Sequence, residues 1–91
     1  MAGYLTGTVK TCADSTGVTV KAYQNGGLVQ SVDGQESSEG VWAYATVLES
    51  GNYSVEATCN TCDKTDTDTA SISGGQNTTC NFDITPQCPN L

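Results

Sequence analysis

Seven short runs of alternating apolar and polar residues follow one another along the chain. In the first run, Leu5 and Val9 share one parity and Thr6, Thr8 and Lys10 share the other. A period of two is that of an extended strand with one buried face, so each run is predicted to be a β-strand. The predicted strands cover residues 4–10, 18–23, 28–32, 41–48, 53–59, 67–73 and 81–85.

Turn-forming residues separate the predicted strands. Asn25-Gly26 is typical of a two-residue hairpin turn, because both central positions of a type I′ turn need a positive φ. The polar residues 33–40 are predicted to form a loop, and segments 49–52 and 74–77 are predicted to form turns. No segment has a helical period of 3.6 residues. We therefore expect one all-β domain over 1–91, with a core at 4–85 and tails at 1–3 and 86–91.

Two segments resemble a known family of β-sandwich domains. They read Gly40-x-Trp42-x-Tyr44-x-x-Val47-x-x-x-Gly51-x-Tyr53-x-Val55 and Gly7-Thr8-Val9 followed by Gly17-Val18-Thr19-Val20. Both are similar to the signatures of carboxypeptidase-regulatory-like domains, which have a transthyretin-like (prealbumin-like) fold. The resemblance implies a seven-stranded antiparallel Greek-key β-sandwich of transthyretin-like or Ig-like form. Under this alignment Trp42 and Tyr44 face inward, and the alternation adds Tyr53 and Phe82 as core aromatics.

The five cysteines are the most informative chemical group. If successive strands run in opposite directions, four thiols meet at one end of the sandwich, namely Cys12, Cys59, Cys62 and Cys88. We expect these four to form two disulfides, for which three connectivities are open. Cys80 has the parity of Phe82 and is predicted to be a buried free thiol. The alternatives are a zinc site with four cysteine ligands, which the spacing of Cys59-x-x-Cys62 allows, or reduced thiols.

Charge and composition narrow the functional classes. The 91 residues contain 3 Lys, no Arg and no His against 10 Asp plus Glu, for a net charge of −7. Such an acidic chain is a poor partner for nucleic acid or for an anionic membrane surface. Without His, the usual general base and the Ser-His and Cys-His nucleophile pairs are absent. We expect a non-enzymatic protein with no cofactor and no metal.

Two acidic groups and one possible cross-link are candidate sites. Asp63, Asp66 and Asp68, and likewise Asp33, Glu36 and Glu39, carry the carboxylates that Ca²⁺ prefers, but solvated loops explain both groups equally well. An isopeptide cross-link between Lys10 and Asn81 beside Glu56 would need buried side chains, whereas the alternation points Lys10 and Glu56 outward.

The remaining function is structural or adhesive. The N-terminal residues lack the basic and apolar regions of a secretion signal, and the chain is acidic and rich in Thr. We expect a structural protein displayed on the outside of a larger assembly, in the first instance a virion capsid decoration subunit. Its partners would be other protein subunits or further copies of itself, at an extracellular or virion surface. The alternative is a spacer, adhesion or carbohydrate-binding module of a secreted or cell-surface protein, which adjacent exposed rings of Tyr4 and Tyr23 would favour.

Overall fold

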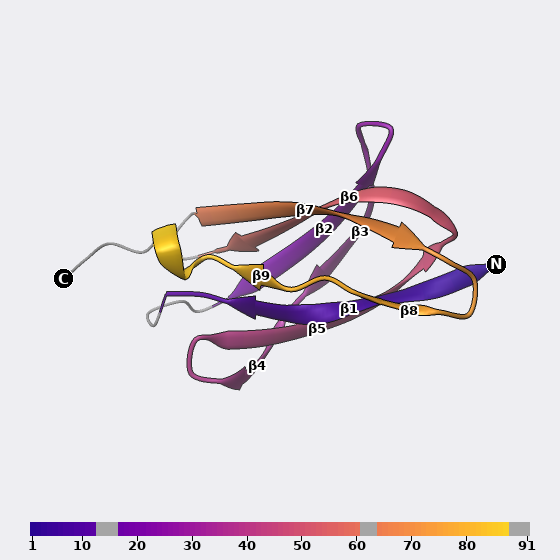
Figure 1. The fold of residues 1–91 in the computed structure, drawn as a ribbon. Coiled ribbons are helices and arrows are strands. Elements are labelled where there is room, and N and C mark those ends of the chain that lie inside the picture. Colours follow the sequence, from indigo (N-terminus) through magenta and orange to yellow (C-terminus); the bar gives the residue numbers. More distant parts are fainter. Residues whose placement is uncertain (13–16, 61–63, 88–91) are drawn as a thin grey trace.

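Two β-sheets packed face to face make up the protein in a computed structural model that describes residues 1–12, 17–60 and 64–87 (Figure 1). The described residues contain nine strands and one short 3₁₀ helix. The elements are β1 (Ala2–Lys10), β2 (Val18–Gln24), β3 (Gly27–Asp33), β4 (Gln35–Ser38), β5 (Val41–Glu49), β6 (Gly51–Cys59), β7 (Lys64–Ile72), β8 (Asn77–Thr79), β9 (Phe82–Asp83) and η1 (Thr85–Gln87).

The first sheet, sheet A, is centred on β1. Its order is β4-β5-β1-β8, and β9 also pairs with β1. β1 and β5 are antiparallel from Ala2↔Glu49 to Lys10↔Val41. β8 and β9 run parallel to β1, because the chain returns to the N-terminal end of β1 before it enters β8 (Figure 1). The predicted common direction of the first and last strands is therefore observed.

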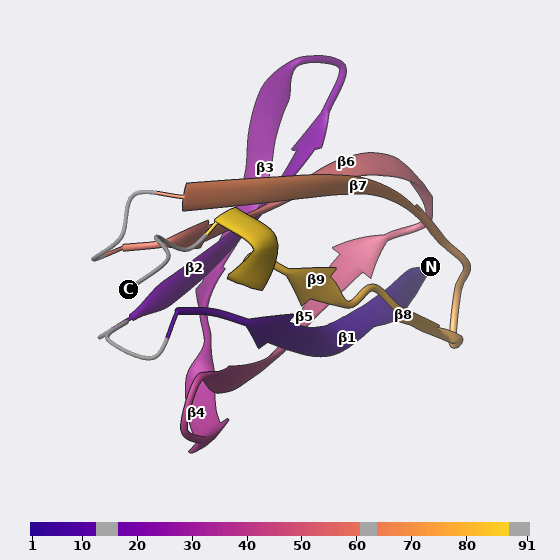
Figure 2. The ribbon, with the colours of Figure 1, turned by 60° about the vertical axis from the view of Figure 1, so that its left-hand side comes forward.

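The second sheet, sheet B, has the order β3-β2-β6-β7 and is antiparallel throughout. The β2–β3 hairpin turns at Asn25 and Gly26, whose φ angles of 54° and 80° are the positive values that the Asn-Gly pair predicted. A register shift between Ala22 and Tyr23 marks an irregularity in the hairpin. The hairpin projects beyond the sandwich, away from sheet A (Figure 2).

The core consists of the inward rows of both sheets. Val18, Val20 and Ala22 of β2 are buried, as the alternation predicts. The four predicted core aromatics, Trp42, Tyr44, Tyr53 and Phe82, are also buried. The two sheets thus cover each other's apolar faces, and burial of these side chains supplies the main driving force for folding.

The all-β class and the two-sheet arrangement are confirmed, but the expected seven strands become nine among the described residues. One addition, β4, lies in the segment that we expected to be a loop. Its residues are exposed on both faces and pair with β5 through the backbone, so no alternation marks them. The other addition arises because the expected strand over 81–85 is replaced by β8 and β9, which flank Cys80 and Asn81.

Two other boundaries also differ from the prediction. β1 begins at Ala2, so residues 2 and 3 belong to sheet A rather than to a tail. β7 begins at Lys64, so Asp66 and Asp68 lie in a strand and not in a loop. In both cases hydrogen bonding to a partner strand, β5 for β1 and β6 for β7, extends the strand past the residues whose pattern is visible.

Candidate functional site

Cys12 and Cys59 lie at the same end of the sandwich. Cys12 follows β1 and Cys59 ends β6, at the end opposite the N-terminus (Figure 1). Both are buried, and neither is a free thiol. The other two members of the set, Cys62 and Cys88, lie outside the described residues.

Cys80 lies between β8 and β9 with its side chain in the interior, and it is a free thiol. Its sulfur lies 3.6 Å from Asp68 Oδ2, and its carbonyl oxygen accepts a hydrogen bond from the Tyr44 hydroxyl. Burial, followed by the charge of Asp68, raises the pKa of the Cys80 thiol to about 11. Burial likewise raises the pKa of Tyr44 above its usual value. The thiol therefore stays protonated at neutral pH and is a poor nucleophile.

The first acidic group contributes hydrogen bonds to the fold. Asp66 Oδ2 accepts a 3.4 Å hydrogen bond from the backbone N–H of Asp83, and so links β7 to β9. Asp83 accepts hydrogen bonds from the hydroxyl and the backbone N–H of Thr85, which hold the pKa of its carboxyl below the usual value. Asp63 lies outside the described residues.

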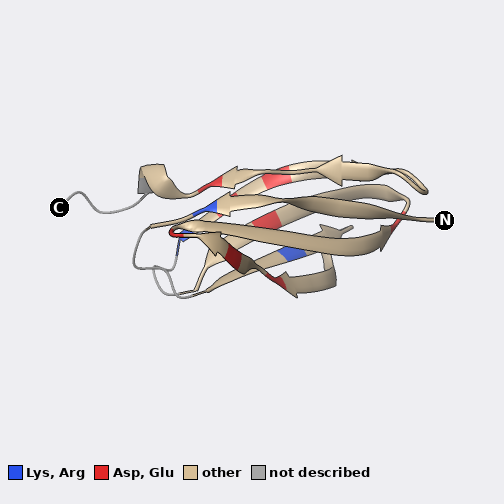
Figure 3. Ribbon diagram, turned by 90° about the horizontal axis from the view of Figure 1, so that it is seen from below, with Lys and Arg blue, Asp and Glu red and all other residues tan. Residues whose placement is uncertain are grey.

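The second acidic group is exposed. Asp33 ends β3, Glu36 lies in β4, and Glu39 lies in the turn before β5. Figure 3 shows that acidic residues are distributed over several strands of both sheets. Nowhere in the described parts of the chain do three or more Asp, Glu, Cys or His side chains form a group able to hold a metal ion.

The three residues of the possible isopeptide site do not come together. Lys10 is exposed at the end of β1, whereas Glu56 lies in sheet B opposite Lys21. The Asn81 side chain accepts a 2.9 Å hydrogen bond from the backbone N–H of Thr8. Asn81 thus replaces a backbone acceptor in the interval between β8 and β9, which is a structural role.

One lateral side of the sandwich is open and apolar. β3 is the edge strand of sheet B and is exposed along nearly its whole length, with Leu28 56% and Val29 49% exposed. β5 of sheet A faces β3. Its outer neighbour β4 pairs with it only up to Ala43, and Val47 of β5 is 52% exposed. A hydrogen bond of 3.0 Å from Gln30 to Thr46 bridges the two strands. A groove of about 310 Å³ between them is bordered by Val29 and Val47.

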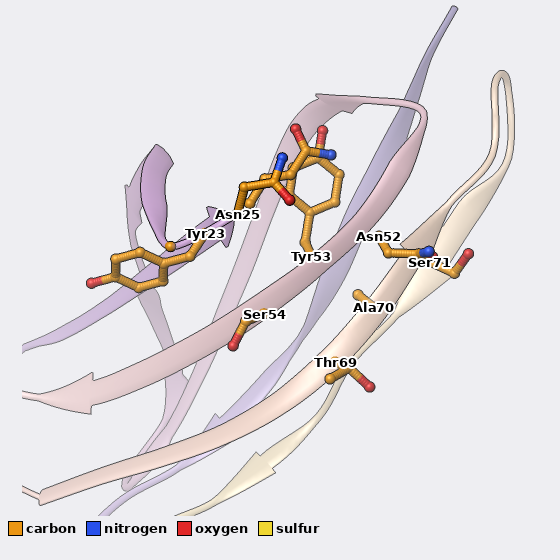
Figure 4. Close-up of a pocket in the computed structure, with 10 residues that line it drawn as sticks. Tyr23, Asn25, Asn52, Tyr53, Ser54, Thr69, Ala70 and Ser71 are labelled. Atoms are coloured by element: carbon orange, nitrogen blue, oxygen red, sulfur yellow. The ribbon is translucent and has the colours of Figure 1, made fainter.

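A second concavity, of about 490 Å³, lies where the β2–β3 hairpin meets β6 and β7 (Figure 4). Its lining includes Tyr23, Tyr53 and several short polar residues, and contains no charged residue. The lining residues are Tyr23, Gln24, Asn25, Gly26, Asn52, Tyr53, Ser54, Thr69, Ala70 and Ser71.

Tyr4 and Tyr23 are not neighbours. Tyr4 is 53% exposed on the outer face of sheet A, opposite Val47, whereas Tyr23 belongs to β2 of sheet B. The two-tyrosine platform considered from sequence is therefore not formed. Sequence reasoning missed both the open side and the pocket at the β2–β3 hairpin. The adjacent apolar pair Leu28-Val29 and the row Thr65, Thr67, Thr69 and Ser71 were the available signals.

Comparison with known proteins assigns the chain to no family. No protein family matches the chain, and no curated protein matches it. The described residues include no helix with the length and apolarity that a membrane crossing requires.

Proposed function

We propose that this chain is a non-enzymatic structural subunit displayed on the outside of a larger protein assembly, with a virion capsid decoration subunit as the favoured case. It associates through the open side of the sandwich, where β3 adds its free edge to a strand of a neighbouring subunit. The observation that carries this proposal is the exposure of β3 on both faces, with Leu28 and Val29 among its residues.

Edge strands of proteins that remain single are usually short, charged, bulged or covered, and β3 has one bulge, at Val29, which the pairing with β2 skips. β3 has seven residues and no charge from Gly27 to Val32. A strand added at such an edge gains backbone hydrogen bonds, and the exposed apolar side chains supply buried area. Association by this route needs no ligand pocket or catalytic group.

The charge distribution favours a second copy of this chain as the neighbour. Although the chain carries a net charge of −7, β3 carries only Asp33, at its last position. In an antiparallel pair of β3 strands centred on Gln30, the two Asp33 side chains lie at opposite ends, each facing Gly27 of the other copy. Like charges therefore do not meet at this edge, whereas they would meet over the acidic parts of both sheets.

Two finer features belong to the same proposal. The topology is that of a transthyretin-like or Ig-like Greek key, as the resemblance implies. Cys12, Cys59, Cys62 and Cys88 form two disulfides, and so close the end of the sandwich in an extracellular or virion environment. Each such cross-link stabilises a small domain by about 2–4 kcal/mol.

The experiment is sedimentation velocity over protein concentrations from micromolar to millimolar. The wild-type chain is expected to associate as concentration rises, and the outward-facing amides of β3 are expected to become protected from hydrogen exchange. Val29→Lys places a charge on the edge and is expected to give a monomer.

Tyr4→Lys is the matched control, because Tyr4 is equally exposed but lies on a sheet face rather than at an edge. It is expected to associate like the wild type. A wild-type chain that is monomeric throughout, or equal loss of association in both variants, contradicts the proposal.

The alternative function is a spacer, adhesion or carbohydrate-binding module, and the adjacent tyrosine rings that would have favoured it are not present. Of Tyr4 and Tyr23, Tyr23 lines the concavity at the β2–β3 hairpin.

A further inference from the structure

The tip of the β2–β3 hairpin consists of Asn25 and Gly26. Both residues are exposed, and the hairpin carries them beyond the body of the sandwich (Figure 2). Among the described residues, neither the Asn25 side chain nor the Gly26 N–H has a hydrogen-bond partner. The carboxamide and the backbone nitrogen that follows it are therefore exposed to solvent and held by no neighbour in the described part of the chain.

Asparagine followed by glycine is the pair in which a side chain reacts most readily with its own backbone. The deprotonated amide nitrogen of the next residue attacks the side-chain carbonyl carbon, and a side chain on that residue hinders the approach. Gly26 has no side chain, and a Cβ built on it would meet nothing within 4 Å. Every other asparagine precedes a residue that has a side chain, namely Asn52, Asn60, Asn77, Asn81 and Asn90.

The pair Asp33-Gly34 shows how the fold suppresses the same chemistry elsewhere, since an aspartate closes the same ring with loss of water. Gly34 is buried, and its N–H donates a 2.9 Å hydrogen bond to the Val18 carbonyl oxygen. A Cβ on Gly34 would lie 3.3 Å from the Cβ atoms of Val18 and Trp42, so this backbone is packed between the two sheets. Packing and a hydrogen bond hold the Gly34 nitrogen in place, and the Gly26 nitrogen has neither.

The hairpin turn must rotate for the ring to close at its tip. The φ angles of Asn25 and Gly26, 54° and 80°, are those of a type I′ turn, and closure requires rotation about the bond between Cα and the carbonyl carbon of Asn25. Gly26 accepts a wide range of backbone angles during this rotation. Only two residue pairs lie between the turn and the register shift at Ala22 and Tyr23, so the rotation disturbs little of the ladder.

We propose that Asn25 is a site of spontaneous deamidation, and that the carboxylate formed there weakens association at the edge of β3. The Gly26 nitrogen gives up its proton and bonds to Asn25 Cγ. The side-chain nitrogen takes up a proton and leaves as ammonia. One water then opens the five-membered imide, at Cγ to give aspartate or at the backbone carbonyl to give isoaspartate. One water is consumed and one ammonia is released, and no oxidant or second protein is needed.

The effect on association rests on the proposed function. In the antiparallel pair of β3 strands, Gly27 of each copy faces Asp33 of the other. Asn25 lies two residues before Gly27, so a carboxylate at this position lies near Asp33 of the neighbouring copy. The two-fold pair contains this encounter twice, and like charges that face each other oppose strand pairing. Isoaspartate also lengthens the backbone of the turn by one carbon and so distorts the start of β3.

The first measurement is peptide mapping of the full chain by mass spectrometry during storage at mildly alkaline pH, where more of the nitrogen is deprotonated. The peptide that contains Asn25 is expected to gain the mass of an amide-to-acid change and to divide into aspartate and isoaspartate forms. Asn52 is the internal control, because it is also exposed but precedes Tyr53. Modification of Asn25 no faster than that of Asn52 overturns the proposal.

The second measurement is sedimentation velocity of two variants that carry the same added charge. Asn25→Asp keeps a residue that suits the type I′ turn, and it is expected to weaken association about three- to tenfold. Asn52→Asp places the charge on β6, two strands from the free edge of β3, and is expected to associate like the wild type. Asn25→Gly also suits the turn but has no carboxamide, and is expected to keep its association during storage.

The outcomes separate this proposal from the proposed function. If the wild type associates, equal association of Asn25→Asp, or equal weakening by Asn25→Asp and Asn52→Asp, overturns the effect of the charge. A wild-type chain that is monomeric throughout contradicts the proposed function and this effect together. The masses of the stored chain decide in either case whether Asn25 is deamidated.

Discussion

The two lateral sides of the sandwich are built on opposite principles. On one side, which we call the closed side, β7 packs beside β8 and β9. Hydrogen bonds of the Thr78 hydroxyl to the Ser71 carbonyl and of the Asp83 N–H to Asp66 connect the sheets. On the other, open side, β3 and β5 face each other with one side-chain hydrogen bond, from Gln30 to Thr46, across the described residues.

The two sides also differ in the charge of their edge strands. The edge strand of the closed side, β7, carries Lys64, Asp66 and Asp68, whereas β3 on the open side is uncharged up to Asp33. Charges on an edge oppose the addition of a further strand, and apolar residues favour it. We infer that the closed side maintains the fold and that the open side is available for association.

The largest expected effect comes from the closed side. A Cβ on Gly7 would lie 2.0 Å from the carbonyl oxygen of Cys80, so Gly7→Ala must separate β1 from the chain between β8 and β9. We expect a loss of roughly 3 kcal/mol in the free energy of unfolding, measured by urea denaturation.

Gly27→Ala is the corresponding change on the open side. The added Cβ would lie 3.7 Å from the Gln24 carbonyl oxygen, which is ordinary contact, and Gly27 has no positive φ. Its effect is expected to stay within about 0.5 kcal/mol. Similar losses of unfolding free energy in Gly7→Ala and Gly27→Ala would contradict the difference between the two sides.

A smaller effect is expected from two tyrosine hydroxyls that donate to backbone carbonyls. Tyr44 donates to Cys80 on the closed side in a buried position, and Tyr53 donates to Glu49 over 2.7 Å in a partly buried position near the open side. Tyr44→Phe is expected to cost about 2 kcal/mol and Tyr53→Phe about 1 kcal/mol or less, since a fully buried carbonyl loses its partner without access to water. Urea denaturation of both variants measures the difference, and the reverse order would contradict it.

The last expected effect is a loss of stability at high pH. The pKa of the Cys80 thiol is 9.0 in its ordinary state and about 11 in the folded protein, where Tyr44, Asp66 and Asp68 lie near it. The folded chain thus keeps a proton that the unfolded chain releases, so this contribution is complete below pH 9 and declines as pH rises from 9 towards 11.

Between pH 9 and pH 10, below the ordinary pKa of Tyr44, Cys80→Ala is expected to lose less stability than the wild type. Urea unfolding at half-unit pH intervals measures the two slopes. If the unfolding free energies of the two proteins fall equally with pH, the prediction that the Cys80 thiol causes the loss is wrong.

How far the sequence predicts this molecule depends on whether one face of a segment is buried. Val18, Val20 and Ala22 alternate with polar residues because sheet A covers one face of β2, and the strand was predicted within one residue. β4 has two exposed faces and no such alternation, so it was expected to be a loop. Cys80 was placed inside from parity alone, but its contact with Asp68 depends on the packing of β7 beside β8 and β9.

The sequence by itself determined the strand periodicity, the Asn-Gly hairpin, the inward aromatic residues and the acidic surface. These features follow from local backbone preferences and from the hydrophobic effect, which buries apolar side chains and leaves charged ones at the surface. Only the tertiary structure decided which edges are closed, that Tyr4 and Tyr23 lie on opposite faces, and that Tyr23, Ser54 and Thr69 share a pocket. These features depend on pairings between residues distant along the chain. Many pairings are compatible with one alternating pattern, and the packing of the whole sandwich selects among them.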